Sequence, residues 1–191
     1  QGLPPLTRED RARLDGRRNS EIFPILFKRE VPREEWQAYE QEKEALYRQL
    51  SRGGVLPIKG LQVLIQRLHD TGVAMALATS APGPNVIHTL AELGIADLFP
   101  VIVRGDEVPR GKPAPDVFLE AARRLNQAPA DCLVFEDSPF GVTAAKAAGM
   151  TAIAIPDSAM AGEKYAHADG VIRSLKMFQP SLCGLPELAW A

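Results

Sequence analysis

Apolar residues are spaced differently in the two parts of the chain. From about Thr7 to Leu50 they recur at helical spacing among many charged residues, which is the pattern of amphipathic helices. The large apolar side chains on this pattern are Trp36, Tyr39, Leu46, Tyr47 and Leu50. Such a stripe could line a ligand pocket, but it is more typical of the core of a helix bundle. We therefore expect a small helical unit over residues 1–54, which ends in the glycine-rich break at residues 51–54.

After Pro57, short apolar runs alternate with amphipathic segments. The runs are "VAMALA" from Val73, "VIV" from Val101, "CLVFE" from Cys132 and "TAIAI" from Thr151. Helical patterns cover residues 60–70, 85–93, 116–125 and 141–148. Strands that alternate with helices predict right-handed crossovers and a parallel sheet with helices on both faces. Residues 55–191 are therefore predicted to form a doubly wound α/β domain.

Composition excludes several classes of function. Of the 191 residues, 46% are hydrophobic and 24% are charged, and the formal net charge is -2. Such a chain can bury a core but offers no basic field for nucleic acid. No apolar run approaches the ~20 residues that span a bilayer, and no signal-peptide pattern opens the chain. We therefore expect no membrane partner and a cytoplasmic location.

The cysteines and histidines suggest no metal site. Cys132 and Cys183 are too few for a disulfide framework or a four-cysteine zinc site, and we expect both to be plain thiols. His69, His88 and His167 lie at unrelated spacings. We expect these histidines to be surface or packing residues.

Polar residues follow the ends of the predicted strands, which is where ligands bind in doubly wound sheets. Thr79 and Ser80 end "VAMALA" and precede a loop with glycine and prolines that leads into a helix N-terminus. Free backbone N–H groups at a helix N-terminus can receive an anion. Lys112 follows "VIV" in a stiff loop between a glycine and a proline. Taken singly, each of these residues is more often a turn, cap or solvated residue.

Two adjacent carboxylates, Glu136 and Asp137, end the run "CLVFE". Ser138 is placed to cap the following helix, and Pro139 to occupy its first position. Asp137 alone could be a turn former, yet an unpaired buried carboxylate is costly, so the pair needs a partner. Because a hydroxyl, an ammonium and two carboxylates meet at one edge of one sheet, we interpret the set as a functional site.

Three of these segments resemble a known family. "LATSAPGPN", "GKPAPDVF" and "VFEDSPFGVTAAKAAG" closely resemble the second, third and fourth motifs of the haloacid dehalogenase superfamily, in its branch of small-sugar phosphatases and β-phosphoglucomutase-like enzymes. "LDGRRNSEIFPILF" resembles part of the helical cap of that branch, and "PIKG" resembles the return of the chain to the core. The resemblance covers essentially the whole chain and implies a Rossmann-like core with a small helical cap.

The resemblance implies roles for the residues at the strand ends. Asp137 and Glu136 would hold Mg²⁺, since that hard cation suits oxygen ligands. Lys112 would neutralise the phosphate and the nucleophile together. Thr79 and Ser80, with neighbouring N–H groups, would orient phosphate oxygens. The implied substrate is a small phosphorylated metabolite.

One motif of the family does not occur in the 191 residues. The nucleophile of the family is an aspartate in a D-x-D-G pattern at the end of its first strand, and this sequence contains no such pattern. The pair Asp15-Gly16 lies in cap-like helical sequence and lacks the preceding aspartate, so we do not assign Asp15 as the nucleophile. The resemblance starts within the cap, and we expect the first strand to be missing between the strands that begin at Val73 and Cys132. Such a gap predicts unpaired strand edges and self-association.

Three interpretations of the function follow. The chain is a phosphatase of this family that lacks its N-terminal segment, an inactive relative that binds phosphate, metal or a protein partner, or an unrelated doubly wound module. In the mutase members of the family an arginine of the cap grips a second phosphate, and Arg17 and Arg18 lie near the corresponding stretch. Arginines on a cap helix are more often solvated, and we favour a phosphatase over a mutase.

Overall fold

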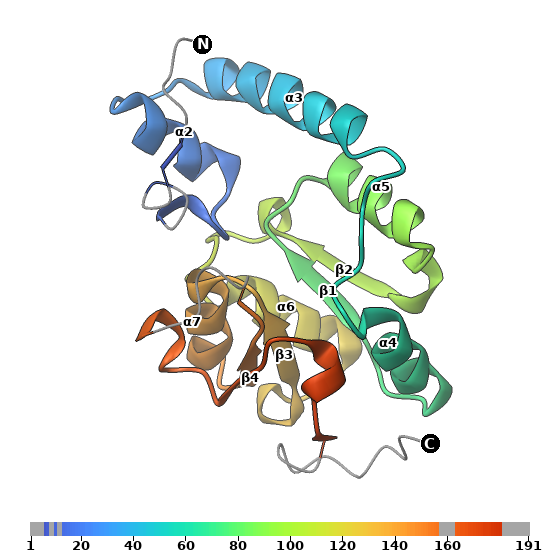
Figure 1. Cartoon of the computed structure of the whole chain (residues 1–191). Helices are drawn as coiled ribbons and strands as arrows, with labels where there is room; N and C mark the ends of the chain where they lie inside the picture. Colours follow the sequence, from blue (N-terminus) through green and yellow to red (C-terminus); the bar gives the residue numbers. More distant parts are fainter. Residues whose placement is uncertain (1–5, 8–9, 11–12, 157–162, 181–191) are drawn as a thin grey trace.

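A computed structural model describes residues 6, 7, 10, 13–156 and 163–180 of the chain (Figure 1). Cys183, which was expected to be a plain thiol, lies outside the described residues. Two helices, α2 (Asn19–Phe27) and α3 (Arg33–Leu50), form a layer apart from the strands. The predicted boundary between residues 54 and 55 lies between α3 and the next helix, and it stays a prediction. Within the described ranges, no helix is long and apolar enough to span a bilayer.

The strands form two parallel sheets. In one sheet β1 (Ala76–Thr79) pairs with β2 (Val101–Arg104). In the other, β4 (Thr151–Ala154) lies between β3 (Leu133–Glu136) and the short β5 (Gly170–Val171). Parallel strands joined through helices confirm the predicted α/β class. Within the described residues, β1 and β3 each keep one edge unpaired.

Helices cover both sheets and join them. They are α4 (Leu61–Asp70), α5 (Gly83–Leu93), α6 (Asp116–Leu125) and α7 (Pro139–Ala147). One buried cluster combines Val103 of β2, Val117 of α6, Val142 of α7 and Ala152 of β4, so the core is continuous across both sheets. Helices α4 and α5 pack a second cluster against β1 and β2. Short 3₁₀ turns occur at Ala96–Leu98, Gly105–Glu107, Pro129–Asp131, Glu163–Tyr165 and Leu175–Met177.

The first strand begins later than the sequence predicts. The apolar run starts at Val73, but β1 starts at Ala76. The N–H group of Val73 donates to the carbonyl oxygen of Leu68 at 2.9 Å, and Gly72 has a positive φ of 71°. These are features of a helix C-cap, so Val73 belongs to the capping turn after α4 and does not start the strand. Because β1 pairs with β2 only from Ala76 onward, no ladder extends it backward.

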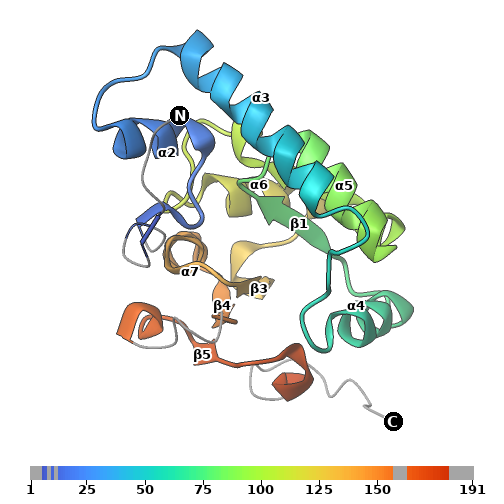
Figure 2. The ribbon, with the colours of Figure 1, turned by 45° about the horizontal axis from the view of Figure 1, so that its top comes forward.

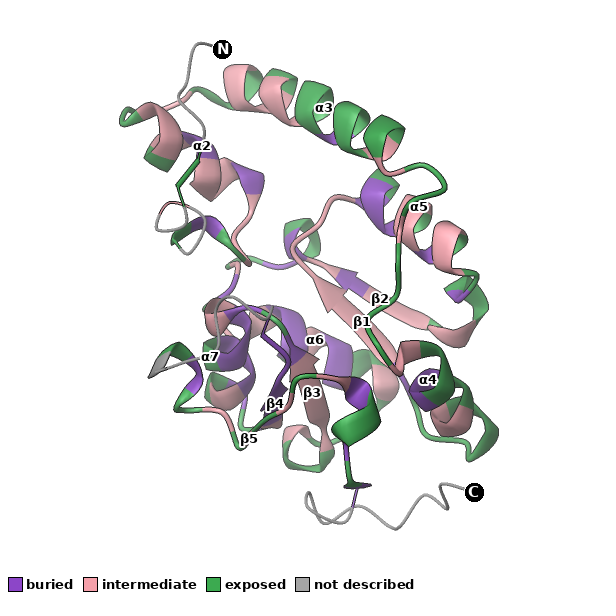
Figure 3. Cartoon of the chain, in the orientation of Figure 1, coloured by how far each residue is buried: buried purple, intermediate pink, exposed green. Residues whose placement is uncertain are grey.

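The predicted bundle core along α3 is wrong for its C-terminal half. Leu46, Tyr47 and Leu50 are exposed, Leu50 by 76%, and Figure 3 shows that this half of α3 is largely exposed. Helix α3 belongs to a layer one helix thick and packs against α5 along one side, so only part of its surface is covered (Figure 2). The aromatic packing of the helical layer lies at its other end, where the Tyr39 ring stacks on Phe27 at 5.1 Å between centroids.

Candidate active site

A cavity of about 540 Å³ opens at the carboxyl ends of β1 and β3, bordered by residues of α2 and α3. The residues predicted from the sequence that line it are Arg17, Thr79, Ser80, Lys112, Glu136 and Asp137. These six come from separate segments of the chain, from residue 17 to residue 137. The predicted residues therefore meet at one site, with the exception of Arg18.

Lys112 and Glu136 form a buried ion pair at the base of the cavity. Each side chain is 6% exposed, and the Lys112 ammonium donates to the Glu136 carboxylate. The same ammonium donates to the carbonyl oxygen of Ala78 in β1 at 3.4 Å and lies 4.8 Å from the centre of the Phe118 ring. Because Glu136 ends β3, one ammonium connects the carboxyl ends of two strands that do not pair with each other.

The structure places Glu136 as a partner of Lys112 and of the loop that follows β3. Its Oε2 atom accepts from the backbone N–H of Ser138 at 3.1 Å and from the Ser138 hydroxyl at 3.0 Å. Ser138 in turn caps α7, since its oxygen accepts from the N–H of Gly141 at 2.9 Å, and Pro139 follows at the first helical position. The predicted helix cap is confirmed. These bonds fix the orientation of the carboxylate.

Asp137 presents the more accessible carboxylate of the pair. It is exposed and lines the cavity. The surrounding protein and the negative charge of Glu136 raise the pKa of its carboxyl, although the Lys112 ammonium opposes the shift. Two carboxylates that repel each other suit a divalent cation, and Mg²⁺ often binds through one or two carboxylates together with water and phosphate. In the described part of the chain, no three His, Cys, Asp or Glu side chains gather around one point.

Thr79 and Ser80 make different contacts at the end of β1. Thr79 Oγ1 accepts from the N–H group of Ala81 at 3.0 Å, so its own proton can still be donated to a ligand. The Ser80 hydroxyl donates to the carbonyl oxygen of Gly16 at 2.8 Å. Ser80 therefore joins the core to the loop before α2, although it also lines the cavity.

The two arginines predicted for the substrate have different positions. Arg17 lines the cavity, where its guanidinium lies 4.3 Å from the centre of the Phe140 ring. Arg18 does not line it, because its guanidinium donates to the carbonyl oxygen of Val108 at 3.1 Å. The assignment of Arg18 to the substrate is thus not supported by its geometry. The side chain packs instead against Gly105 and Gly111, near the loop of Lys112.

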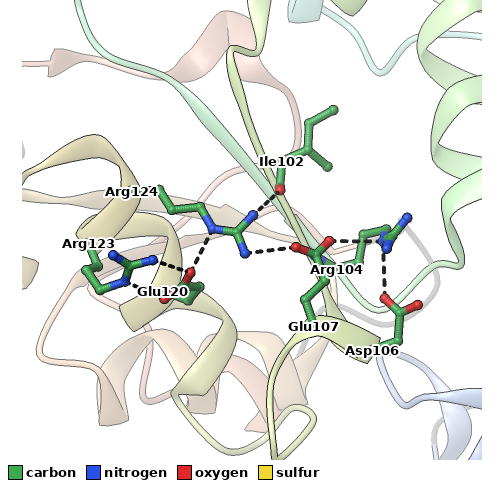
Figure 4. Close-up of polar contacts among 7 residues, drawn as sticks. All are labelled: Ile102, Arg104, Asp106, Glu107, Glu120, Arg123 and Arg124. Carbon is green, nitrogen blue, oxygen red and sulfur yellow. Dashed lines mark hydrogen bonds and ion pairs between the residues drawn. The ribbon is translucent and has the colours of Figure 1, made fainter.

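An ion-pair network holds the segments on either side of the Lys112 loop (Figure 4). Glu107 bonds to Arg124 at 2.8 Å and to Arg104 at 3.0 Å, and Arg124 also bonds to Glu120 at 2.7 Å. A further pair, Arg110 and Asp116, bridges the loop itself at 2.9 Å. The network involves the end of β2, the turn after it and α6, and thereby orders both ends of the segment that carries Lys112.

Sequence reasoning missed a polar cluster on the opposite wall of the cavity. Glu44 of α3 is 7% exposed, and it is the buried residue of a helix that is otherwise exposed or half-buried. Its carboxylate accepts from Asn19 at 2.8 Å and from Asn85 at 2.5 Å, and it pairs with Lys43. All four residues line the cavity. A glutamate among the many charges of α3 gave no signal that it would be buried.

Comparisons with known proteins agree with the family resemblance. The model of the family described as haloacid dehalogenase-like hydrolase matches residues 1–155. The chain is 42% identical over 157 residues to a probable pseudouridine-5'-phosphatase of Drosophila melanogaster, covering 79% of this chain and 68% of that protein. It is 45% identical over 130 residues to a bifunctional riboflavin kinase/FMN phosphatase of Arabidopsis thaliana, covering 68% of this chain and 34% of that protein. The chain therefore spans only part of these relatives.

The fold is also shared with solved structures. A crystal structure of a CbbY variant from Rhodobacter sphaeroides in complex with xylulose-(1,5)bisphosphate superposes with a TM-score of 0.82 at 27% identity, over 92% of this chain and 82% of that one. The family match covers well over half of the sequence and includes all the strand-end residues of the cavity. The chain belongs to the haloacid dehalogenase-like hydrolase family.

Proposed function

We propose that this protein is a phosphatase that hydrolyses a small phosphorylated metabolite with the help of Mg²⁺. The observation that carries the proposal is the buried Lys112 ammonium, held between the ends of β1 and β3 at the base of the cavity. Phosphoryl transfer is catalysed mainly by positioning and by stabilising charge. A fixed cation beside a hydroxyl donor and two carboxylates supplies these elements.

Each residue of the base has a proposed role. Lys112 binds a phosphate oxygen and offsets the negative charge that builds up during transfer. Thr79 donates a hydrogen bond from its hydroxyl group to a second phosphate oxygen. Asp137, supported by Glu136, is the ligand of Mg²⁺, which when bound would screen the phosphate oxygens from the carboxylates. The names of the two relatives support this class of reaction, because each describes a phosphatase.

The nucleophile is the element that the 191 residues do not supply. Asp15 lies in a turn and is exposed, which is unlike the end of a strand. We propose that an aspartate acts from a strand placed between the unpaired edges of β1 and β3. That position would put the end of the strand beside Lys112, because the Lys112 ammonium lies between these two strands.

A second candidate function is a binding protein without turnover. It is favoured by the edges of β1 and β3 that stay unpaired in the described part of the chain, together with the absence of D-x-D-G from the sequence. Unpaired edges of parallel strands attract another strand, so this candidate predicts self-association or a partner that adds a strand. Sedimentation of the 191-residue chain over a range of concentrations would detect dimers.

The deciding experiment measures Mg²⁺-dependent release of phosphate from p-nitrophenyl phosphate. The 191-residue chain is compared with the same chain extended by a strand that ends in D-x-D-G. We expect turnover only from the extended chain, and we expect Lys112→Ala to remove most of it. Lys59→Ala, at an exposed lysine on the surface, is the control and should leave the rate unchanged. Rapid turnover by the 191 residues alone would refute the missing nucleophile, and an extended chain that stays inactive would favour the binding protein.

A further inference from the structure

The wall of the cavity formed by α3 and α5 has a distinctive chemistry. Glu44 of α3 is bonded to Asn19 at 2.8 Å and to Asn85, near the start of α5, at 2.5 Å. Arg48 donates to the other side of the Asn85 amide at 2.6 Å. Since α5 belongs to the core and α3 to the helical layer, the cluster joins the two across the cavity. We refer to Asn19, Glu44 and Asn85 as the amide–carboxylate cluster.

The Glu44 carboxylate keeps its negative charge in this position. Burial alone would raise its pKa, but hydrogen bonds from Lys43, Asn19 and Asn85 outweigh burial and hold the pKa below its ordinary value. The described donors place two bonds on Oε1 and one on Oε2. A carboxylate oxygen accepts about two hydrogen bonds, so Oε2 can take one more donor. A ligand hydroxyl can donate a hydrogen bond to this oxygen, whereas an ionised phosphate group is a negatively charged acceptor and is repelled by it.

Positive charge for a second phosphate is scarce at this end of the cavity. Arg18 is turned away toward Val108. Arg17 faces the cavity, but its Nε donates to the carbonyl oxygen of Arg13 at 3.0 Å, and its guanidinium covers the Phe140 ring. Lys43 is paired with Glu44 itself, and Arg48 donates to Asn85 and does not line the cavity. A second phosphate would therefore meet a fixed carboxylate, and like charges in a partly enclosed site repel.

We propose that the amide–carboxylate cluster binds the alcohol portion of the substrate and selects monophosphates whose alcohol carries hydroxyl groups over bisphosphates. The proposal rests on the proposed phosphate site at Lys112 and Thr79. It assigns Glu44 as the residue that determines this specificity, through a hydrogen bond accepted from a hydroxyl and through repulsion of a second phosphate. The substrate class is thus a monophosphate whose alcohol carries at least one further hydroxyl group.

Binding to the 191-residue chain tests the proposal without requiring turnover. Isothermal titration calorimetry in the presence of Mg²⁺ compares three probes: inorganic phosphate, ribose 5-phosphate and ribulose 1,5-bisphosphate. We expect ribose 5-phosphate to bind at least tenfold more tightly than the bisphosphate. Glu44→Gln, which removes the charge at nearly constant size, should reduce that ratio to about threefold or less while inorganic phosphate binds unchanged.

A matched control and a second variant separate specificity from folding. Glu40 lies one turn earlier on α3 and also accepts from Asn19 at 2.8 Å, but it does not line the cavity. Glu40→Gln should leave the ratio unchanged. If Glu44→Gln fails to fold, as seen by circular dichroism, Asn85→Ser removes a bond to the same carboxylate and should weaken ribose 5-phosphate more than inorganic phosphate. The proposal is overturned if folded Glu44→Gln keeps the wild-type preference for ribose 5-phosphate over the bisphosphate. It is also overturned if folded Asn85→Ser keeps the wild-type preference for ribose 5-phosphate over inorganic phosphate.

Other outcomes assign the error to a particular residue. Tighter binding of the bisphosphate, lost in Arg17→Ala, would overturn the proposal and place a second phosphate on Arg17. If no probe binds, inorganic phosphate included, the phosphate site itself is refuted and the specificity inference falls with it. If inorganic phosphate binds and ribose 5-phosphate gains nothing over it, only the cluster's role is refuted and the proposed phosphate site stands.

Discussion

Replacing Lys112 with methionine would test the buried ion pair on which the site depends. Methionine keeps much of the length of the side chain but leaves the Glu136 carboxylate without its cation. Both side chains are 6% exposed, so water cannot readily take the place of the ammonium. The variant should therefore lose stability, in addition to any loss of function.

The expected loss can be bounded from the contacts of Glu136. Removing one partner of a buried ion pair typically costs about 3–5 kcal/mol. Glu136 keeps two hydrogen bonds from Ser138, at 3.1 and 3.0 Å, which still stabilise its charge. We therefore expect the lower end of the range, about 3 kcal/mol, or roughly two orders of magnitude in the folding equilibrium.

Urea denaturation, followed by circular dichroism, measures this free energy. EDTA is present so that no divalent cation replaces the ammonium. The double variant Lys112→Met/Glu136→Gln should recover at least half of the loss, because the amide is neutral and still accepts from Ser138. Lys146 pairs with Asp169 at 2.7 Å on the surface, with 36% and 40% of the side chains exposed, and Lys146→Met should cost at most about 1 kcal/mol. A loss below that of Lys146→Met, or a double variant as unstable as the single one, would refute the reasoning.

Three further predictions concern other parts of the molecule. Gly16 has a φ of 86°, and an added Cβ would lie 2.5 Å from Ser138 Oγ. Gly16→Ala should therefore destabilise the protein by about 1–3 kcal/mol in the same denaturation assay. A variant as stable as the wild type would contradict this. Asp137→Asn should weaken Mg²⁺ binding in calorimetry at neutral pH, since it removes a charged ligand, and unchanged affinity would exclude Asp137 from the metal site. Two arginines lower the pKa of Glu120 to about 2. Because this pKa is depressed by folding, the stability that Glu120 contributes should be present above about pH 4.5 and be lost as the pH falls toward 2. The free energy of unfolding of Glu120→Gln should therefore differ from that of the wild type near pH 6 and converge with it near pH 2. A difference that stays constant with pH would refute the assignment.

The sequence by itself determined the elements of the core and the chemistry at their ends. Helix α6 begins at Asp116 and ends at Leu125 as predicted, because an amphipathic pattern between a proline-rich loop and Asn126 has few alternatives. Ser138 and Pro139 form the predicted helix start, since capping depends on residues next to each other in the chain. Thr79, Lys112 and Asp137 meet at one cavity because the carboxyl ends of β1 and β3, although they belong to separate sheets, both border it.

Tertiary structure alone decided which charged residues are buried and where the long side chains point. Glu44 looks like any solvated glutamate of α3, and it is buried because Asn19 and Asn85 approach it from other helices. Arg17 and Arg18 are adjacent in sequence, yet the first lines the cavity and the second is bonded to Val108. Local sequence sets the backbone and the caps, whereas the desolvation of a charge depends on neighbours that are remote in the chain, so only the packed fold reveals it.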